Sequence, residues 1–119
     1  MTDRMQEPTM LVLTALADMP RHGYAIMQEV AAISGGRVNL RTGTLYGALD
    51  RLVRQGLITM CAPEIVHGRT RRAYALTPVG RDALAAEAQR LQSTLNAVTH
   101  RLAAPAPAPA QPAALEGLA

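Results

Sequence analysis

The sequence predicts a mainly α-helical fold with a small β-hairpin and a long C-terminal helix. Three observations lead to this prediction. Apolar residues recur at helical spacing in three segments before residue 56, and the spacing then changes to the alternation of strands over residues 57–77. Beyond residue 78, apolar residues follow a heptad pattern. We therefore divide the chain into a domain of residues 1–77, a helix of residues 78–103 and a disordered Ala/Pro-rich tail of residues 104–119.

Two helices are expected in the N-terminal part of the chain. The first covers about residues 8–17 and starts with Pro8, which suits a first-turn position. The second covers about residues 24–34 and ends at a glycine pair. Helical spacing predicts that their buried faces consist of Met10, Leu13, Leu16, Ala17, Ile26, Val30 and Ile33. The alternating residues 37–40, RVNL, predict a very short strand.

The stretch RTGTLYGALDRLVRQGLI, residues 41–58, predicts a third helix that ends at Gly56. Its apolar face is expected to consist of Leu45, Leu49, Leu52 and Val53. Residues 57–61 and 71–77 have strand character, and Gly68 between them offers a turn. These two segments therefore predict a β-hairpin with an arginine-rich tip.

The fourth helix is expected to run from Pro78 to about Ala103, with Thr77 as its N-cap. Its apolar residues make an a/d seam over nearly three heptads, and the helix would be roughly 39 Å long. The domain of residues 1–77 is too small to cover such a seam, so we expect a second copy of the chain to cover it. The alternative is that the helix folds back over its own domain. The predicted dimer interface comprises Leu84, Ala88, Leu91, Leu95, Val98 and Leu102.

The basic residues are all arginines, and they are concentrated in one part of the chain. Residues 37–72 contain seven arginines against Asp50 and Glu64 and carry a net charge of +5, whereas residues 1–36 sum to −2 and residues 73–119 to 0. Such a segment suggests a polyanion partner, usually nucleic acid; the alternative is an ordinary solvated surface. Since it coincides with the third helix and the hairpin, charge and element order together predict a winged helix-turn-helix. In that fold the third helix enters the major groove, and we expect the hairpin, or wing, to lie along the DNA backbone.

Several short motifs follow one another in an order that resembles the PadR family of transcriptional regulators. They are HGY at 22–24, GTLY at 43–46, L-x-R-L at 49–52, GLI at 56–58 and LTPVG at 76–80. The resemblance covers about residues 7–103, and the single C-terminal helix resembles the shorter PadR subgroup. It implies a homodimer, usually a repressor, that a small molecule releases from its operator. Some relatives bind flat aromatic drugs between tryptophans at the dimer interface, and this chain lacks tryptophan.

The predicted DNA-binding residues begin with the start of the third helix. Arg41, Thr42 and Thr44 lie where outward backbone N–H groups attract phosphate, although Thr42 could instead cap the helix. The resemblance puts the hydroxyl of Tyr46 on a phosphate, and the alternative is a packed tyrosine with a satisfied hydroxyl. The remaining predicted contacts are Tyr24 in the second helix, Arg51 and Arg54 late in the third, and Arg69 and Arg71 in the wing.

His22, beside Tyr24, could equally be a capping or a buried histidine. In the wing, neighbouring strand residues face opposite ways, so only some of its basic residues can touch DNA together. Arg69 is the best candidate because it lies nearest the turn.

The sequence offers little for catalysis, so we expect neither an enzyme nor a cofactor. Cys61, Glu64 and His67 lie close together, but their spacing fits no structural zinc pattern. The preferred hypothesis is that the chain is a homodimeric, sequence-specific DNA-binding regulator. We expect it to act as a repressor that binds a near-palindromic operator and a small-molecule effector at its dimer interface. The alternatives are a winged-helix protein-interaction module and a metal or ligand sensor that uses the wing. The single cysteine and the lack of a long apolar run predict a cytoplasmic protein that does not enter the membrane.

Overall fold

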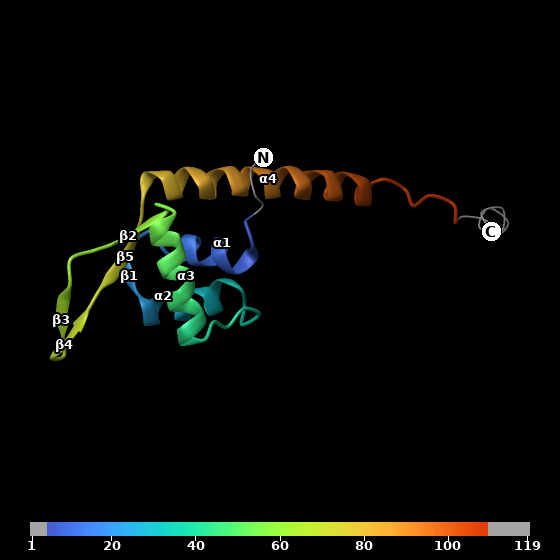
Figure 1. Ribbon diagram of the computed structural model, residues 1–119. Helices are drawn as coiled ribbons and strands as arrows, with labels where there is room; N and C mark the ends of the chain where they lie inside the picture. Colours follow the sequence, from blue (N-terminus) through green and yellow to red (C-terminus); the bar gives the residue numbers. More distant parts are fainter. Residues whose placement is uncertain (1–4, 110–119) are drawn as a thin grey trace, which may run out of the picture. The chain divides into compact units, whose positions relative to one another are not determined.

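The computed structural model describes residues 5–109 and confirms a mainly helical fold with a small wing (Figure 1). By contacts, the chain divides into one compact unit over Met1–Gln89 and a second over Arg90–Ala119. The elements, in order, are α1 (Glu7–Ala15), β1 (Arg21–His22), α2 (Gly23–Ile33), α3 (Thr42–Arg54), β2 (Ile58–Met60), β3 (Glu64–Val66), β4 (Arg69–Arg71), β5 (Ala73–Leu76) and α4 (Pro78–Ala103). The first compact unit thus includes the first half of α4.

The predicted hairpin is present, and its strands take part in two short sheets. In the first sheet, β5 lies between β1 and β2 and is antiparallel to both. Beyond it, β3 and β4 pair as a two-stranded ribbon, with Val66 opposite Arg69. His67 and Gly68 join the two strands with φ angles of 51° and 76°, as a two-residue hairpin turn requires. The ladder is interrupted near Pro63, which has no backbone N–H to donate.

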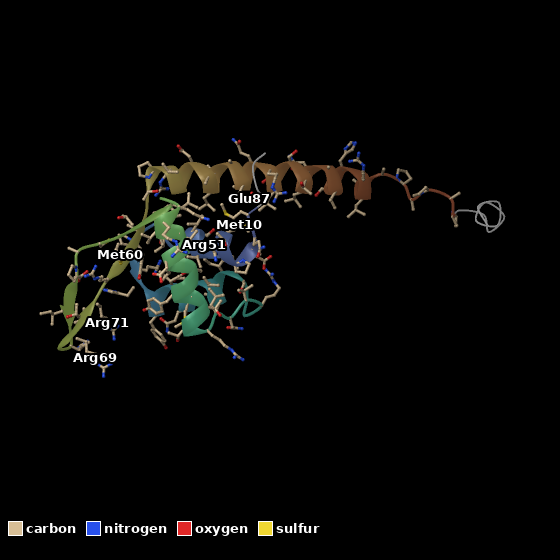
Figure 2. The ribbon with its side chains drawn as sticks, viewed as in Figure 1. Met10, Arg51, Met60, Arg69, Arg71 and Glu87 are labelled. Carbon is tan, nitrogen blue, oxygen red and sulfur yellow. The ribbon has the colours of Figure 1, made fainter. Side chains whose placement is uncertain are left out.

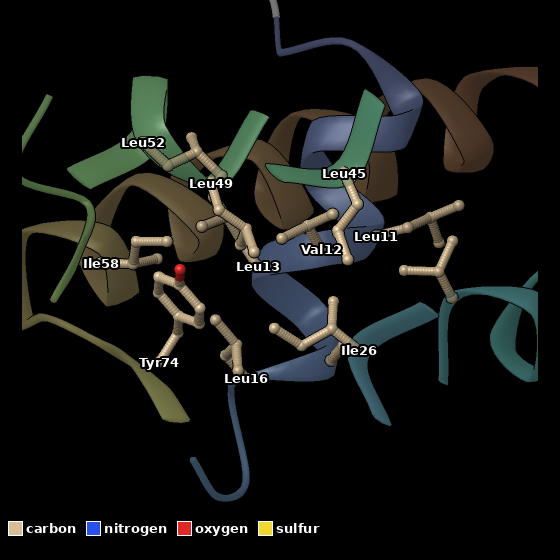
Figure 3. Close-up of a cluster of buried hydrophobic side chains, with 12 residues drawn as sticks. Leu11, Val12, Leu13, Leu16, Ile26, Leu45, Leu49, Leu52, Ile58 and Tyr74 are labelled. Atoms are coloured by element: carbon tan, nitrogen blue, oxygen red, sulfur yellow. The ribbon is translucent and has the colours of Figure 1, made fainter. Parts of the chain in front are cut away.

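The core is aliphatic apart from one tyrosine, and it joins α1, α2 and α3 to the first sheet (Figure 3). It consists of Leu11, Val12, Leu13, Ala15, Leu16, Ile26, Val30, Leu45, Leu49, Leu52, Ile58 and Tyr74. The three predicted leucines of α3 are fully buried, and Val53 packs beside them. Because truncating a buried leucine to alanine typically costs about 2–5 kcal/mol, these three side chains hold the orientation of α3 firmly.

Some local expectations were wrong. Residues 37–40 do not form a strand, because Gly35 and Gly36 turn the chain and the hydroxyl of Ser34 accepts a hydrogen bond from Val38 N–H. A two-residue strand forms instead at Arg21–His22, where it pairs with β5. Ile33, which was predicted to be buried, is exposed at the end of α2. In α1, Leu11 and Val12 are buried as well as the predicted Leu13, so more than one face of this helix is covered.

The start of α4 follows the prediction closely. The hydroxyl of Thr77 accepts a hydrogen bond from Gly80 N–H at 3.0 Å and donates one to the Gly56 carbonyl at 2.6 Å, so it caps the helix and ties it to the end of α3. A Cβ atom on Gly80 would lie 2.0 Å from the carbonyl oxygen of Leu57, so only glycine fits there. Residues 104–109 form no helix or strand, and the rest of the predicted tail, residues 110–119, lies outside the described residues.

Candidate nucleic-acid interface

The exposed side of α3 begins with a helix start that no side chain caps. Arg41 occupies the N-cap position and makes no side-chain cap bond, so the alternative that Thr42 caps the helix is wrong. Thr42, Gly43 and Thr44 form the first turn and are exposed, and first-turn N–H groups have no acceptor within the helix. This end of α3 therefore presents donors and a positive dipole end to the surroundings.

The arginines of the described chain fall into two groups according to their partners. In the first group, Arg21 pairs with Asp18 and Glu29, Arg37 pairs with Glu7, and Arg81 donates to the Ala17 carbonyl. This group also includes Arg51, Arg90 and Arg101, which interact with other residues of the chain. The second group makes neither a hydrogen bond nor an ion pair within residues 5–109. It consists of Arg41, Arg54, Arg69, Arg71 and Arg72. Every member of the second group lies on α3, directly before it, or in the wing, so the unpaired positive charge is concentrated on one part of the winged domain.

Arg51 and Arg54, the two arginines late in α3, differ in their surroundings. Arg51 donates to the hydroxyl of Thr9 in α1 at 3.4 Å, a long and exposed hydrogen bond (Figure 2 labels Arg51). Arg54 has no such partner in the described residues. Five residues separate Arg51 from Tyr46, so the two lie roughly 140° apart around the helix. Arg51 thus faces the α1 side of α3, whereas Tyr46 faces the wing.

A hollow of about 530 Å³ joins the start of α2, the middle of α3 and the base of the wing. Its lining residues are His22, Gly23, Tyr24, Tyr46, Thr70, Arg71, Arg72 and Tyr74. The structure therefore brings together three of the predicted DNA-binding residues, Tyr24, Tyr46 and Arg71. The sequence interpretation did not connect Gly23, Thr70 or Tyr74 with this site, because they come from separate elements.

The polar groups around the hollow are mostly hydrogen-bond donors. The hydroxyls of Tyr24 and Tyr46 make no hydrogen bond within the described residues, and Nε2 of His22 is buried without a partner there. Burial raises the pKa of the Tyr74 hydroxyl, and the nearby Tyr46 and Asp50 raise it further, whereas Arg72 opposes them. Tyr74 therefore stays protonated at neutral pH.

The tip of the wing lies beyond this hollow. Arg69 and Arg71 alternate with Thr70 along β4 and so share one face of the ribbon, and both are labelled on the wing in Figure 2. Arg69 lies opposite Val66 next to the turn, and Arg71 lies opposite Glu64. The two arginines can thus follow one strand of a polyanion together.

Comparison with known proteins identifies the family. A family model described as "Transcriptional regulator PadR-like family" matches residues 12–86, most of the winged domain and the start of α4. The chain belongs to the PadR-like family of transcriptional regulators. The PadR-like chain is 40% identical to "Transcriptional regulator Rv3488" of Mycobacterium tuberculosis over 81 residues, which cover 68% of this chain and 72% of that protein.

Two further proteins are similar to this chain. A 37.1 kDa protein of a Streptomyces fradiae transposon is 46% identical over 88 residues, which are 74% of this chain and 24% of that protein, so the PadR-like chain matches only about a quarter of its length. The crystal structure of a PadR family transcription regulator from Clostridium difficile superposes with a TM-score of 0.68 at 26% identity, and the match covers 82% of this chain and 99% of that one. The winged-helix fold and the PadR resemblance are thereby confirmed.

The family assignment supports the predicted binding to DNA, and the structure bears on the alternative of a metal site. PadR-like regulators bind DNA, and transcriptional regulators are not a class of enzymes. Among residues 5–109, no three Cys, His, Asp or Glu side chains gather where they could hold a metal ion, so Cys61, Glu64 and His67 form no such cluster. Within residues 5–109, no helix has the length and apolar character that crossing a bilayer requires.

Proposed function

We propose that this PadR-like protein is a homodimeric repressor that binds a near-palindromic operator and is released by a small-molecule effector. The observation that carries DNA binding is the group of five arginines on α3, directly before it and in the wing that have no hydrogen-bond or ion-pair partner within residues 5–109. An arginine without an internal partner keeps all its donors for phosphate, and neutralising phosphates supplies most of the affinity of such proteins for DNA. In this arrangement α3 enters the major groove and the wing follows the backbone.

The exposed face of α4 supports a dimer. Leu91, Leu95, Val98 and Leu102 are 40%, 56%, 48% and 79% exposed, although they recur at the spacing of an a/d seam. Leu84 packs against the core of its own domain, so the start of the seam already has an internal role. Exposed apolar rows of this kind mark interaction surfaces, and the matching seam of a second copy is the natural partner.

The proposed dimer sets the distance between the two half-sites of the operator. Two copies of α3 related by a two-fold axis would read half-sites about one helical turn, roughly 34 Å, apart. An effector that binds where the two chains meet would favour one angle between the winged domains over another and so release the DNA. The chain has no tryptophan, so stacking between tryptophans is not the way it would hold an effector.

A gel-shift assay on the DNA upstream of the protein's own gene tests the proposal. We expect binding that prefers this duplex to a shuffled duplex of the same composition and that weakens steeply with added salt. Binding with neither sequence preference nor salt dependence would contradict the function. A stable protein partner together with no binding to DNA at low salt would instead favour an interaction module.

A further inference from the structure

The hollow at the start of α2 depends on a contact that only glycine allows. A Cβ atom on Gly23 would lie 2.4 Å from the hydroxyl oxygen of Tyr46, 2.8 Å from its Cζ atom and 3.3 Å from its Cε1 atom. The ring of Tyr46 thus lies directly against the first residue of α2. Gly23 does not have a positive φ, so its backbone conformation suits any residue. Space for Tyr46 is therefore the reason for glycine at this position.

The position of Tyr46 decides which hydrogen-bond donors line the hollow. Tyr46 comes from α3, Tyr24 from α2, and Arg71 and Arg72 from the wing, so three separate elements contribute donors to one place. None of the eight lining residues is an Asp or a Glu. A site that offers hydroxyl and guanidinium donors and no carboxylate fits an anion that only accepts hydrogen bonds, and a DNA phosphate is such an anion.

We propose that the hollow holds a single phosphate of each DNA half-site between α3 and the wing, and that Gly23 is the positioning residue that sets Tyr46 against this phosphate. The inference rests on the proposed DNA-binding function and adds the shared phosphate and the role of Gly23. A side chain at position 23 would push the Tyr46 hydroxyl out of the hollow while the arginines stay in place. The recognition helix and the wing would then no longer grip the same phosphate.

A double-mutant cycle tests the role of Gly23. We expect Gly23→Ala to weaken operator binding about tenfold or more, which is the size of a lost hydrogen bond to a charged group. In a Tyr46→Ala background the same substitution should change affinity by less than about twofold, because no ring remains for the new methyl group to displace. Additive losses in the two backgrounds would overturn the positioning role, as would wild-type affinity of Gly23→Ala. Thermal unfolding of all four proteins shows whether each is folded.

Operator duplexes with one neutral methylphosphonate at each backbone position in turn test the shared phosphate. Wild type and Tyr46→Phe are compared, since the second protein keeps the ring and loses only the hydroxyl. We expect one position in each half-site at which neutralisation weakens the wild type about tenfold and Tyr46→Phe by less, because the variant has already lost the hydroxyl contact to that phosphate and keeps only the wing arginines there. Equal losses for both proteins at every position would overturn the shared phosphate. If the wild type itself ignores the operator, the proposed function fails as well, so the two failures are distinguishable.

Discussion

The tip of the wing allows a quantitative test of DNA-backbone binding. Arg69 follows the turn at His67 and Gly68, is exposed, and makes no hydrogen bond or ion pair within the described residues. Replacing Arg69 with alanine therefore removes no hydrogen bond or ion pair within residues 5–109. We expect the thermal midpoint of Arg69→Ala to equal that of the wild type, so any loss of affinity arises in the complex.

The size of the effect follows from counterion release. Each neutralised phosphate of duplex DNA contributes about −0.9 to the slope of log affinity against log salt. A dimer has two copies of Arg69, so Arg69→Ala should flatten this slope by about 1.8. Between about 50 and 200 mM salt, the wild type should then lose about tenfold more affinity than the variant loses.

Fluorescence anisotropy of a labelled operator and a shuffled duplex across a salt series measures both quantities. Arg101→Ala is a matched control, because it removes the same charge from a side chain that, within residues 5–109, bonds the Ala97 carbonyl of its own helix. Arg69→Ala should weaken binding to both duplexes and flatten both slopes. If it instead changes the preference at one base pair and leaves the salt slope unaltered, Arg69 reads a base and its backbone assignment is wrong.

Three further predictions address the seam, the packing and the charge. Leu95→Glu should yield a monomer by light scattering, whereas Gln89→Glu, off the seam, should not; a persistent Leu95→Glu dimer would refute the seam. Gly80→Ala should lower the free energy of unfolding in urea by about 1–3 kcal/mol because the methyl group meets the Leu57 carbonyl, whereas Gly47→Ala, with nothing within 4 Å, should raise it by up to about 1 kcal/mol. Equal changes would refute this packing argument. Asp50→Asn should tighten binding to every duplex severalfold, since it removes an exposed negative charge from α3; weaker binding to the operator alone would show that Asp50 reads a base.

Most helices and the wing could be predicted because their signals are local. The apolar period of α3 lies within thirteen residues, and it was enough to predict that Leu45, Leu49 and Leu52 are buried. Thr77 and Pro78 likewise mark the start of α4 by their own chemistry. Short strands have no such signal. The two residues of β1 are a strand only because β5, about fifty residues later, supplies their hydrogen bonds.

For the candidate site too, single residues could be predicted from the sequence, but their arrangement could not. Element order and charge were enough to select Tyr24 and Arg71 as contacts, since exposed basic and hydroxyl side chains suit a polyanion, and the family resemblance added Tyr46. Those signals contain no information about which side chains lie together. Gly23 and Tyr46 are 23 residues apart, and their contact exists because three buried leucines fix the rotation of α3 above the start of α2. The sequence by itself thus determined the helices and the wing, the family and the basic character of one surface, because these depend on local pattern. Only the tertiary structure decided that α2, α3 and the wing share one hollow, because packing sets that position.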